Sequence, residues 1–248
     1  MTESADVVPL LSVEHVTKRF GGLTAVSKVS FAGRTGEMVG IIGPNGAGKT
    51  TLFNCVSGHF RATEGSVRVD GEDVSRSPAH HRARLGLGRT FQIVHPITSL
   101  TVLENVMVGA FSEHRNRNRV ERRAWEVLEK VELQHRAHIS AGALTLADRK
   151  RLEVARAVAG NTKLLMLDEV MAGLNPTESE RAIQMVKRLN SDGLAVLLIE
   201  HNLKVVRALA QHVLVLDHGA QIAEGTPAQV LDDPKVIEAY LGVKAVKS

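Results

Sequence analysis

The feature that most constrains this chain is a glycine-rich loop placed between an apolar stretch and a helical one. Residues 43–50 read Gly-Pro-Asn-Gly-Ala-Gly-Lys-Thr, a complete phosphate-binding loop motif. Residues 38–42 are apolar, as expected of a buried strand, and residues 51–56 have the composition of a helix. Glycines let the backbone curl closely around a polyphosphate, and the free N–H groups at the helix N-terminus then face the phosphates. The sequence therefore predicts a nucleoside triphosphate site.

Two side chains of this loop have predicted roles of their own. We expect the Lys49 ammonium to reach the β- and γ-phosphates and the Thr50 hydroxyl to ligate Mg²⁺. With the backbone groups of the loop, they make up the predicted nucleotide-binding residues, which are Gly43, Pro44, Asn45, Gly46, Ala47, Gly48, Lys49, Thr50 and Thr51.

The composition is that of a globular protein of a reducing compartment. With 248 residues, of which 44% are hydrophobic and 23% charged, the chain is long enough to bury a large core. No uninterrupted apolar run approaches the roughly 20 residues that cross a bilayer. Residues 1–6 lack the pattern of a signal peptide, and the single cysteine, Cys55, cannot form an internal disulfide. We therefore expect a cytoplasmic protein.

The charge balance does not select a partner by itself. A net charge of +4 is compatible with a membrane surface or with nucleic acid. Aromatic residues make up only 3% of the chain, so stacking platforms for single-stranded nucleic acid are scarce. The most basic run, residues 115–123, is interpreted as a solvated loop and helix start, with lipid headgroups or an acidic partner as the alternative contact.

The secondary-structure pattern predicts an α/β core that is interrupted by helices. Strand patterns dominate up to about residue 95, residues 96–159 are helical, and the α/β alternation returns after residue 160. Thr101 and Glu104 form a possible capping box at one helix start. We therefore predict one domain over residues 1–248, with a helical subdomain at about 96–159.

A pair of carboxylates follows an apolar strand at residues 164–169, Leu-Leu-Met-Leu-Asp-Glu. Ligands bind at the carboxyl ends of the strands in a parallel sheet, so both acids are expected near the phosphates. Asp168 is predicted to reach Mg²⁺ directly or through water. Glu169 is predicted to polarise the water that attacks the γ-phosphate.

Two further polar residues complete the predicted catalytic set. His201 follows the apolar strand 194–199, where it can hydrogen-bond the γ-phosphate and hold the attacking water. Gln92 lies at the passage into the helical insert, where a neutral amide can touch Mg²⁺ or the attacking water. The predicted catalytic residues are Lys49, Gln92, Glu169 and His201, and the predicted metal ligands are Thr50, Gln92 and Asp168.

The order of these elements resembles the ATPase subunit of an ABC transporter over essentially the whole chain. The resemblance implies a phosphate-loop NTPase core of α/β class, an antiparallel β subdomain and a helical insert. It also implies ATP and Mg²⁺ as the cofactors and ATP hydrolysis as the activity. In residues 19–26, it suggests that Phe20 stacks on the adenine and that Val26 packs beside it.

The chain departs from the family in the segment that caps the partner subunit's ATP. Residues 144–148 read Leu-Thr-Leu-Ala-Asp where the family usually has Leu-Ser-Gly-Gly-Gln; we call them the signature segment. Thr145 keeps a hydroxyl that can cap the following helix. Ala147 replaces a glycine where the backbone approaches phosphate, and Asp148 is expected to place a carboxylate near the γ-phosphate, where like charges repel. The helix dipole and the neighbouring Arg149 are expected to offset part of this repulsion. In the segment after the two carboxylates, Asn175 stands where the family usually has an aspartate.

Because each ATP in this family lies between one phosphate loop and the other subunit's signature segment, the departure predicts unequal sites. The site built on Lys49, Glu169 and His201 is expected to be competent if its partner supplies a good signature. The opposite site, capped by residues 145–148, is expected to hydrolyse poorly. A homodimer would have two weakened caps, so a heterodimer with a second ATPase is favoured and a homodimer is the alternative.

Four stretches narrow the resemblance to one branch of the family. Residues 20–26, 89–92, 172–176 and 239–242 look like the ATPases of branched-chain amino acid importers. Lipopolysaccharide-export ATPases are similar in places, so the substrate and the direction of transport stay open. The implied partners are integral-membrane permease subunits at the cytoplasmic face of the inner membrane, whose coupling helix would dock near residues 92–100.

Two other classes are weighed against a transporter motor. A DNA- or ribosome-associated ABC ATPase usually carries a long coiled coil or tandem ATPase domains, whereas this chain has a short insert and one phosphate loop. No nucleic-acid partner is therefore expected. A regulatory ATP binder is disfavoured by the intact Lys49, Asp168, Glu169 and His201, although the degraded signature segment argues mildly for it.

Overall fold

A six-stranded sheet lies at the centre of the molecule. The computed structural model describes residues 8–90, 96–111 and 116–241. The strand order is β10-β9-β3-β8-β7-β6, in which all neighbours are parallel except the β9–β10 pair. The strands of this sheet are β3 (Met38–Ile42), β6 (Leu87–Arg89), β7 (Leu164–Asp168), β8 (Ala195–Ile199), β9 (His212–Asp217) and β10 (Ala220–Gly225).

A second, antiparallel sheet has the order β2-β1-β4-β5. Its strands are β1 (Leu11–Phe20), β2 (Leu23–Gly33), β4 (Glu64–Val69) and β5 (Glu72–Asp73). The β4–β5 turn is formed by Asp70 and Gly71, whose φ angles are 52° and 79°. Positive φ at both positions matches the twist of a two-residue hairpin.

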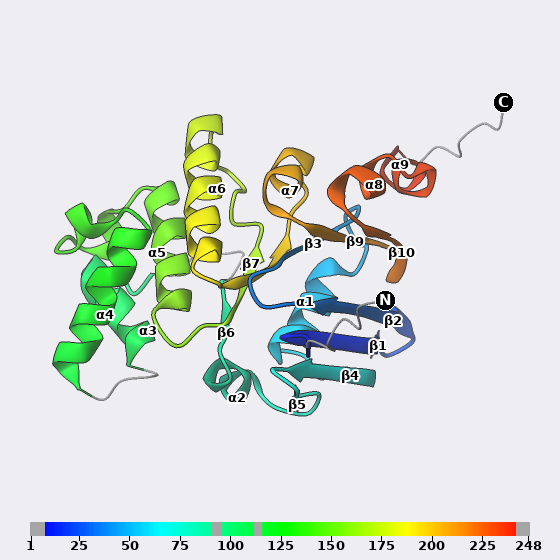
Figure 1. Cartoon of the computed structure of the whole chain (residues 1–248), viewed down its shortest axis with the longest axis horizontal. Helices are drawn as coiled ribbons and strands as arrows, with labels where there is room; N and C mark the ends of the chain where they lie inside the picture. Colours follow the sequence, from blue (N-terminus) through cyan, green and yellow to red (C-terminus); the bar gives the residue numbers. More distant parts are fainter. Residues whose placement is uncertain (1–7, 91–95, 112–115, 242–248) are drawn as a thin grey trace, which may run out of the picture.

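Helices cover both faces of the parallel sheet and form one end of the molecule (Figure 1). The helices are α1 (Lys49–Ser57), α2 (Ala79–Arg84), α3 (Val102–Ala110), α4 (Arg117–Lys130), α5 (Leu146–Val158), α6 (Pro176–Ser191), α7 (Leu203–Leu209), α8 (Pro227–Leu231) and α9 (Pro234–Leu241). Two 3₁₀ turns lie at Gln134–Arg136 and Ala141–Ala143. Within the described ranges, no helix combines the length and the apolar composition that crossing a membrane requires.

The central strands β3, β7 and β8 of the parallel sheet are buried on both faces, and alternate residues serve different cores. In β7, Leu164 and Met166 face the cluster shared with α1 and the antiparallel sheet, whereas Leu165 and Leu167 face the cluster shared with α5 and α6. This follows from the two-residue period of a strand. It also explains why β7 reads as a continuous apolar run, because buried parallel strands show no polar alternation.

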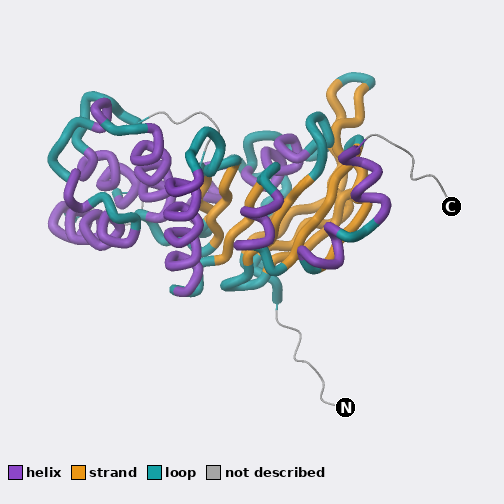
Figure 2. Tube along the Cα trace, turned by 90° about the horizontal axis from the view of Figure 1, so that it is seen from above, coloured by secondary structure: helices purple, strands orange, loops and turns teal. Residues whose placement is uncertain are grey.

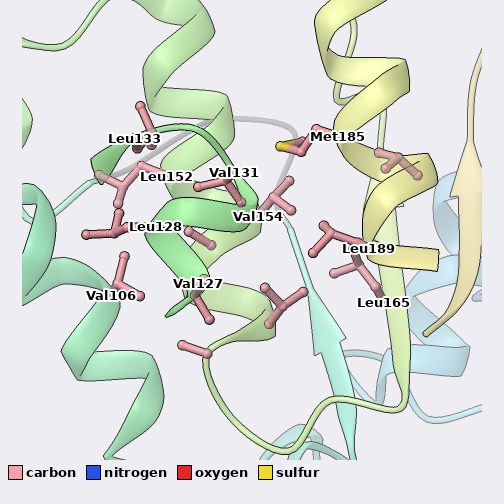
Figure 3. Close-up of a cluster of buried hydrophobic side chains, with 14 of the residues drawn as sticks. Val106, Val127, Leu128, Val131, Leu133, Leu152, Val154, Leu165, Met185 and Leu189 are labelled. Atoms are coloured by element: carbon pink, nitrogen blue, oxygen red, sulfur yellow. The ribbon is translucent and has the colours of Figure 1, made fainter. Parts of the chain in front are cut away.

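The helices α3, α4 and α5 lie together at one end of the molecule, away from the antiparallel sheet (Figures 1 and 2). Their buried side chains join those of β7 and α6 in one continuous cluster, part of which is drawn in Figure 3. On α4, the apolar residues recur at the helical spacing Val120, Ala124, Val127 and Leu128 and face this cluster. The same helix carries its arginines on other faces, which explains the mixed basic and apolar sequence.

The helix starts follow from capping residues that the sequence contains. A capping box joins Thr101 to Glu104 at the start of α3, as predicted. Another joins Asn175 to Glu178 at the start of α6, with Pro176 in the first turn. These caps satisfy backbone N–H groups that would otherwise lack partners at a helix N-terminus.

Candidate nucleotide-binding site

The phosphate loop follows β3 and is shaped by three glycines with positive φ. A Cβ atom at Gly43 would lie 2.1 Å from the carbonyl oxygen of Leu216, and one at Gly48 would lie 2.4 Å from that of Ala25. At Gly46, whose φ is 80°, no atom lies within 4 Å of the corresponding position. The loop is thus held tightly against the protein at Gly43 and Gly48, while at Gly46 it faces open space.

The helix that follows the loop presents an uncapped N-terminus. Gly48 is the N-cap of α1 and provides no side-chain hydrogen bond to cap the helix. The first turn of α1 contains no acid. Backbone N–H groups and the helix dipole at such an end favour a negatively charged ligand. This arrangement fits a phosphate group.

The side chain of Lys49 folds back along the loop. Its Nζ donates hydrogen bonds to the carbonyl oxygens of Gly43, at 2.7 Å, and Pro44, at 2.9 Å. Burial lowers the pKa of Lys49, and the carboxylates of Glu169 and Asp168 oppose that shift. The ammonium is therefore held against the loop, within electrostatic reach of both predicted acidic residues.

A cleft of about 740 Å³ runs along the loop. That size lies in the range of small-molecule sites. Besides residues 45–51 and Glu169, its walls include Phe20, Leu23, Ala25 and His218. Phe20 is 43% exposed and makes an edge-to-face contact with Phe60 at 5.4 Å between ring centroids. A base placed in this cleft can therefore reach the ring of Phe20.

The structure corrects the expectation for Val26. This side chain is completely buried and packs behind Gly48 in the core shared by α1 and the antiparallel sheet. It presents no surface to the cleft. The cleft wall on this strand is formed instead by the three preceding residues, 23–25.

The two carboxylates after β7 lie in different environments. Asp168 is the last residue of the strand and is buried, with Oδ2 3.6 Å from Nη2 of Arg89. Burial raises the pKa of Asp168, and the Arg89 guanidinium opposes that rise. Arg89 is itself fixed by a hydrogen bond to Ser57 Oγ, at 2.6 Å, and by the ring of Phe53 beneath it. The sequence motif pointed to Asp168 but not to this arginine partner.

Glu169 and His201 come together from neighbouring strands. Nδ1 of His201 lies 3.7 Å from Oε1 of Glu169, and both side chains retain access to solvent. The strands β7 and β8 pair in parallel, with Asp168 opposite Ile199, so their carboxyl ends meet at one edge. Glu169 also adopts a φ of 48°, and its N–H donates to the carbonyl of Ile199 at 3.0 Å. The predicted base and the predicted histidine are therefore adjacent.

Of the remaining predicted residues, Thr50 and Thr51 lie in the first turn of α1 and line the cleft. Gln92 lies outside the described residues. Three residues without a predicted role contact this region. Tyr240 bonds the phosphate loop, and Lys150 and Glu200 contact the turn after Asp168. All three are distant in sequence from the groups that they contact, so no local motif marks them.

The signature segment forms the start of α5 with a different electrostatic outcome from the one expected. Thr145 caps the helix by accepting a hydrogen bond from the N–H of Asp148 at 3.2 Å. The Asp148 carboxylate is 6% exposed and pairs with Arg151, at 2.6 Å, and with Arg136, at 3.3 Å. It is thus neutralised by two arginines and does not present a free negative charge at the helix N-terminus.

Comparison with known proteins relates this chain to one large family. The chain matches the ABC transporter family over residues 26–172 and the branched-chain amino acid ATP-binding cassette transporter family over residues 220–246. It is 43% identical to BraF of Pseudomonas aeruginosa, a high-affinity branched-chain amino acid transport ATP-binding protein, over 94% of this chain and 98% of that protein.

Other relatives extend the comparison. LptB of Haemophilus influenzae, a lipopolysaccharide export system ATP-binding protein, is 36% identical over 94% of this chain and 97% of that protein. The crystal structure of the ADP conformation of MJ1267, an ATP-binding cassette of an ABC transporter, has a TM-score of 0.86 and 32% identity over 96% of this chain and 100% of that chain. The chain belongs to the ABC transporter family, as an ATP-binding cassette that hydrolyses ATP.

Proposed function

We propose that this chain is the ATP-hydrolysing subunit of an importer for branched-chain or related amino acids. The observation that carries the hydrolytic part is the meeting of Lys49, Asp168, Glu169 and His201 at the carboxyl edge of the parallel sheet. The substrate class is supported by the match of residues 220–246 and by the 43% identity to BraF.

In this proposal, the backbone of residues 43–51 binds the triphosphate of ATP and Phe20 stacks on the adenine. Thr50 and Asp168, with Gln92, would hold Mg²⁺, which neutralises phosphate charge when bound. No group of three His, Cys, Asp or Glu side chains with a metal-binding arrangement occurs among the described residues. That agrees with a magnesium ion that takes most of its ligands from phosphates and water.

The chemical work then falls to three side chains. Glu169 accepts the proton of the attacking water, and His201 orients that water and the γ-phosphate from the neighbouring strand. Lys49 turns from the two carbonyls that it now contacts towards the phosphate oxygens, where its charge stabilises the transferring group. Access of Glu169 to solvent leaves a path for the attacking water.

The proposed partners are permease subunits in the membrane and a second ATPase. A cassette named MJ0796, 28% identical to this chain with a TM-score of 0.78, has been solved as a dimer in a post-hydrolysis state with ADP and Pi. We infer a similar sandwich here, at the cytoplasmic face of the membrane. A heterodimer is favoured because Ala147 replaces a glycine in the signature segment.

A lipopolysaccharide exporter is the second candidate, because LptB is 36% identical over 94% of this chain. A measurement of amino acid uptake by cells distinguishes the importer from the exporter. Cells that lack the gene are expected to lose most high-affinity uptake of radiolabelled leucine, isoleucine and valine. The wild-type gene restores uptake and the Lys49→Ala gene does not.

Normal uptake in cells that lack the gene would overturn the importer proposal. Copurification from native membranes identifies the assembly independently. We expect the Glu169→Gln chain, solubilised with Mg·ATP, to bring down two permease subunits and a second ATPase. A homodimer on other membrane proteins would favour export.

A further inference from the structure

The turn that carries Glu169 has an energetically unfavourable backbone conformation, which contacts with neighbouring residues must stabilise. Glu169 has a φ of 48°, a left-handed conformation that residues with a side chain rarely adopt. Such conformations persist where surrounding contacts fix them. We call residues 169–173 the catalytic turn, because they directly follow Asp168 and begin with the proposed base.

Lys150 of α5 provides one of these contacts. Its side chain is buried, and its Nζ donates a hydrogen bond to the carbonyl oxygen of Glu169 at 3.2 Å. The same carbonyl accepts from the N–H of Ala172 at 3.0 Å. Burial lowers the pKa of Lys150, while the carboxylates of Glu200, Glu153 and Glu169 oppose that shift.

A second contact joins the first turn of α5 to the far end of the catalytic turn. Cδ2 of Leu146 lies 3.3 Å from the position that a Cβ atom would take at Gly173. The middle of the turn is held by Glu200, the residue directly after β8, whose Oε1 accepts from the N–H of Met171 at 3.3 Å. The catalytic turn is thus contacted both from α5 and from the end of β8.

The start of α5 is also the signature segment, which the proposed function places on the partner's nucleotide. Thr145 and Lys150 are less than two helical turns apart on one rigid helix of 13 residues. A tilt of α5 on closing over that nucleotide therefore moves the Lys150 ammonium and the carbonyl that it bonds. In this way the proposed base Glu169 of one nucleotide site is connected to the signature segment that covers the other nucleotide site.

We propose that Lys150 is a positioning residue that fixes the catalytic turn and couples the signature helix of this chain to its own Glu169. The inference rests on the proposed function and goes beyond it, because it assigns the link between the two nucleotide sites to one buried ammonium. The described residues that line the nucleotide cleft do not include Lys150.

The test compares three variants of the full chain in its assembled complex. Lys150→Met keeps the length and burial of the side chain and removes the charge and the hydrogen bond. Lys150→Arg keeps a donor. Arg123→Met is the matched control, because Arg123 donates to the carbonyls of Val158 and Ala159 at the opposite end of α5.

We expect Lys150→Met to lower kcat by about ten- to a hundredfold, since a displacement of about 1 Å of a catalytic group has effects of that order. Its affinity for a non-hydrolysable ATP analogue is expected to stay within about twofold of wild type, because the phosphate loop is untouched. Lys150→Arg is expected to recover most of the lost rate. Arg123→Met is expected to keep the wild-type kcat.

Hydrogen exchange gives a readout that does not depend on turnover. The peptide spanning residues 168–174 is expected to exchange faster in Lys150→Met than in wild type or in Arg123→Met. Wild-type kcat and unchanged exchange in Lys150→Met would overturn this inference alone. Equal losses of kcat in Lys150→Met, Lys150→Arg and Arg123→Met would also overturn it, because they would indicate a general packing defect. A wild-type complex that binds ATP and hydrolyses none would overturn the proposed function itself.

Discussion

The hydroxyl of Tyr240 accepts a hydrogen bond from the N–H of Gly43 at 2.8 Å, which ties α9 to the first residue of the phosphate loop. Gly43 is buried, and its N–H has to find a partner within the protein. Burial raises the pKa of Tyr240, so its hydroxyl is neutral at physiological pH. The C-terminal segment that distinguishes this branch of the family therefore takes part in the geometry of the nucleotide site.

Replacing Tyr240 with Phe removes this acceptor and keeps the ring. We expect the free energy of unfolding to fall by about 1–2 kcal/mol, because a buried N–H is left without a partner. Urea denaturation followed by circular dichroism measures the change. A loss below about 0.3 kcal/mol would contradict the structural role of this bond.

A buried arginine is predicted to stabilise the helix that follows the phosphate loop. Nη1 of Arg82 donates to the carbonyls of Cys55, at 2.8 Å, and Val56, at 2.7 Å, which are among the last carbonyls of α1. The Cys55 carbonyl also accepts from the N–H of Gly58 at 3.4 Å. Arg82→Met is expected to lower the free energy of unfolding by about 3 kcal/mol. Arg82→Lys, which keeps a donor, is expected to lose less. Guanidinium denaturation checks both, and equal losses would show that the hydrogen bonds do not matter.

Glu200 is expected to make stability depend on pH. Burial raises its pKa to about 7, and Met171, His201 and Lys150 oppose that rise while Glu169 adds to it. Because the folded-state pKa lies above the unfolded value, the carboxylate destabilises the fold progressively as the pH rises from about 4.5 to 7. Glu200→Gln removes this effect and can still accept from Met171.

We therefore expect Glu200→Gln to be more stable than wild type by about 2 kcal/mol at pH 8 and nearly equal to it at pH 5. Denaturation at both pH values measures the difference. Glu129→Gln, at an exposed position of α4, is the control. Its stability is expected to be close to that of wild type at both pH values. A stability difference for Glu200→Gln that does not change with pH would contradict the assignment.

The degraded signature segment is expected to limit turnover at the partner's site. Ala147→Gly restores the residue type that lets a backbone approach phosphate closely. We expect it to raise the steady-state ATPase rate of the assembled complex by about twofold or more, since the gain is in transition-state contacts. Unchanged kcat would show that the N-terminus of α5 supports full turnover at the partner's site with Ala147 in place.

Much of the candidate site could be predicted because its chemistry is carried by short segments. The phosphate loop and the pair Asp168 and Glu169 each lie at the end of an apolar strand, and parallel pairing brings those ends to one edge. Their roles in catalysis stay predictions. Position along the chain was enough to group them, because strand ends are where parallel sheets place ligand contacts.

The contacts that support these residues could not be predicted in the same way. Lys150 and Glu169 are 19 residues apart, and Tyr240 lies 197 residues from Gly43. Neither pair forms a sequence motif, so only the packing of α5 and α9 brings them together. Of the two arginines that neutralise Asp148, Arg151 lies three residues further along α5, at a spacing that the sequence shows. Arg136 comes from the 3₁₀ turn Gln134–Arg136 and shows the same limit as the two pairs above.

Glu169→Gln gives the most direct test of the central claim that this carboxylate activates the attacking water. The amide keeps the size of the side chain and cannot accept the proton. In the assembled complex, single-turnover ATP hydrolysis is expected to fall by at least about a hundredfold, while the affinity for Mg·ATP stays within about twofold of wild type. Hydrolysis at the wild-type rate with unchanged affinity would contradict the claim.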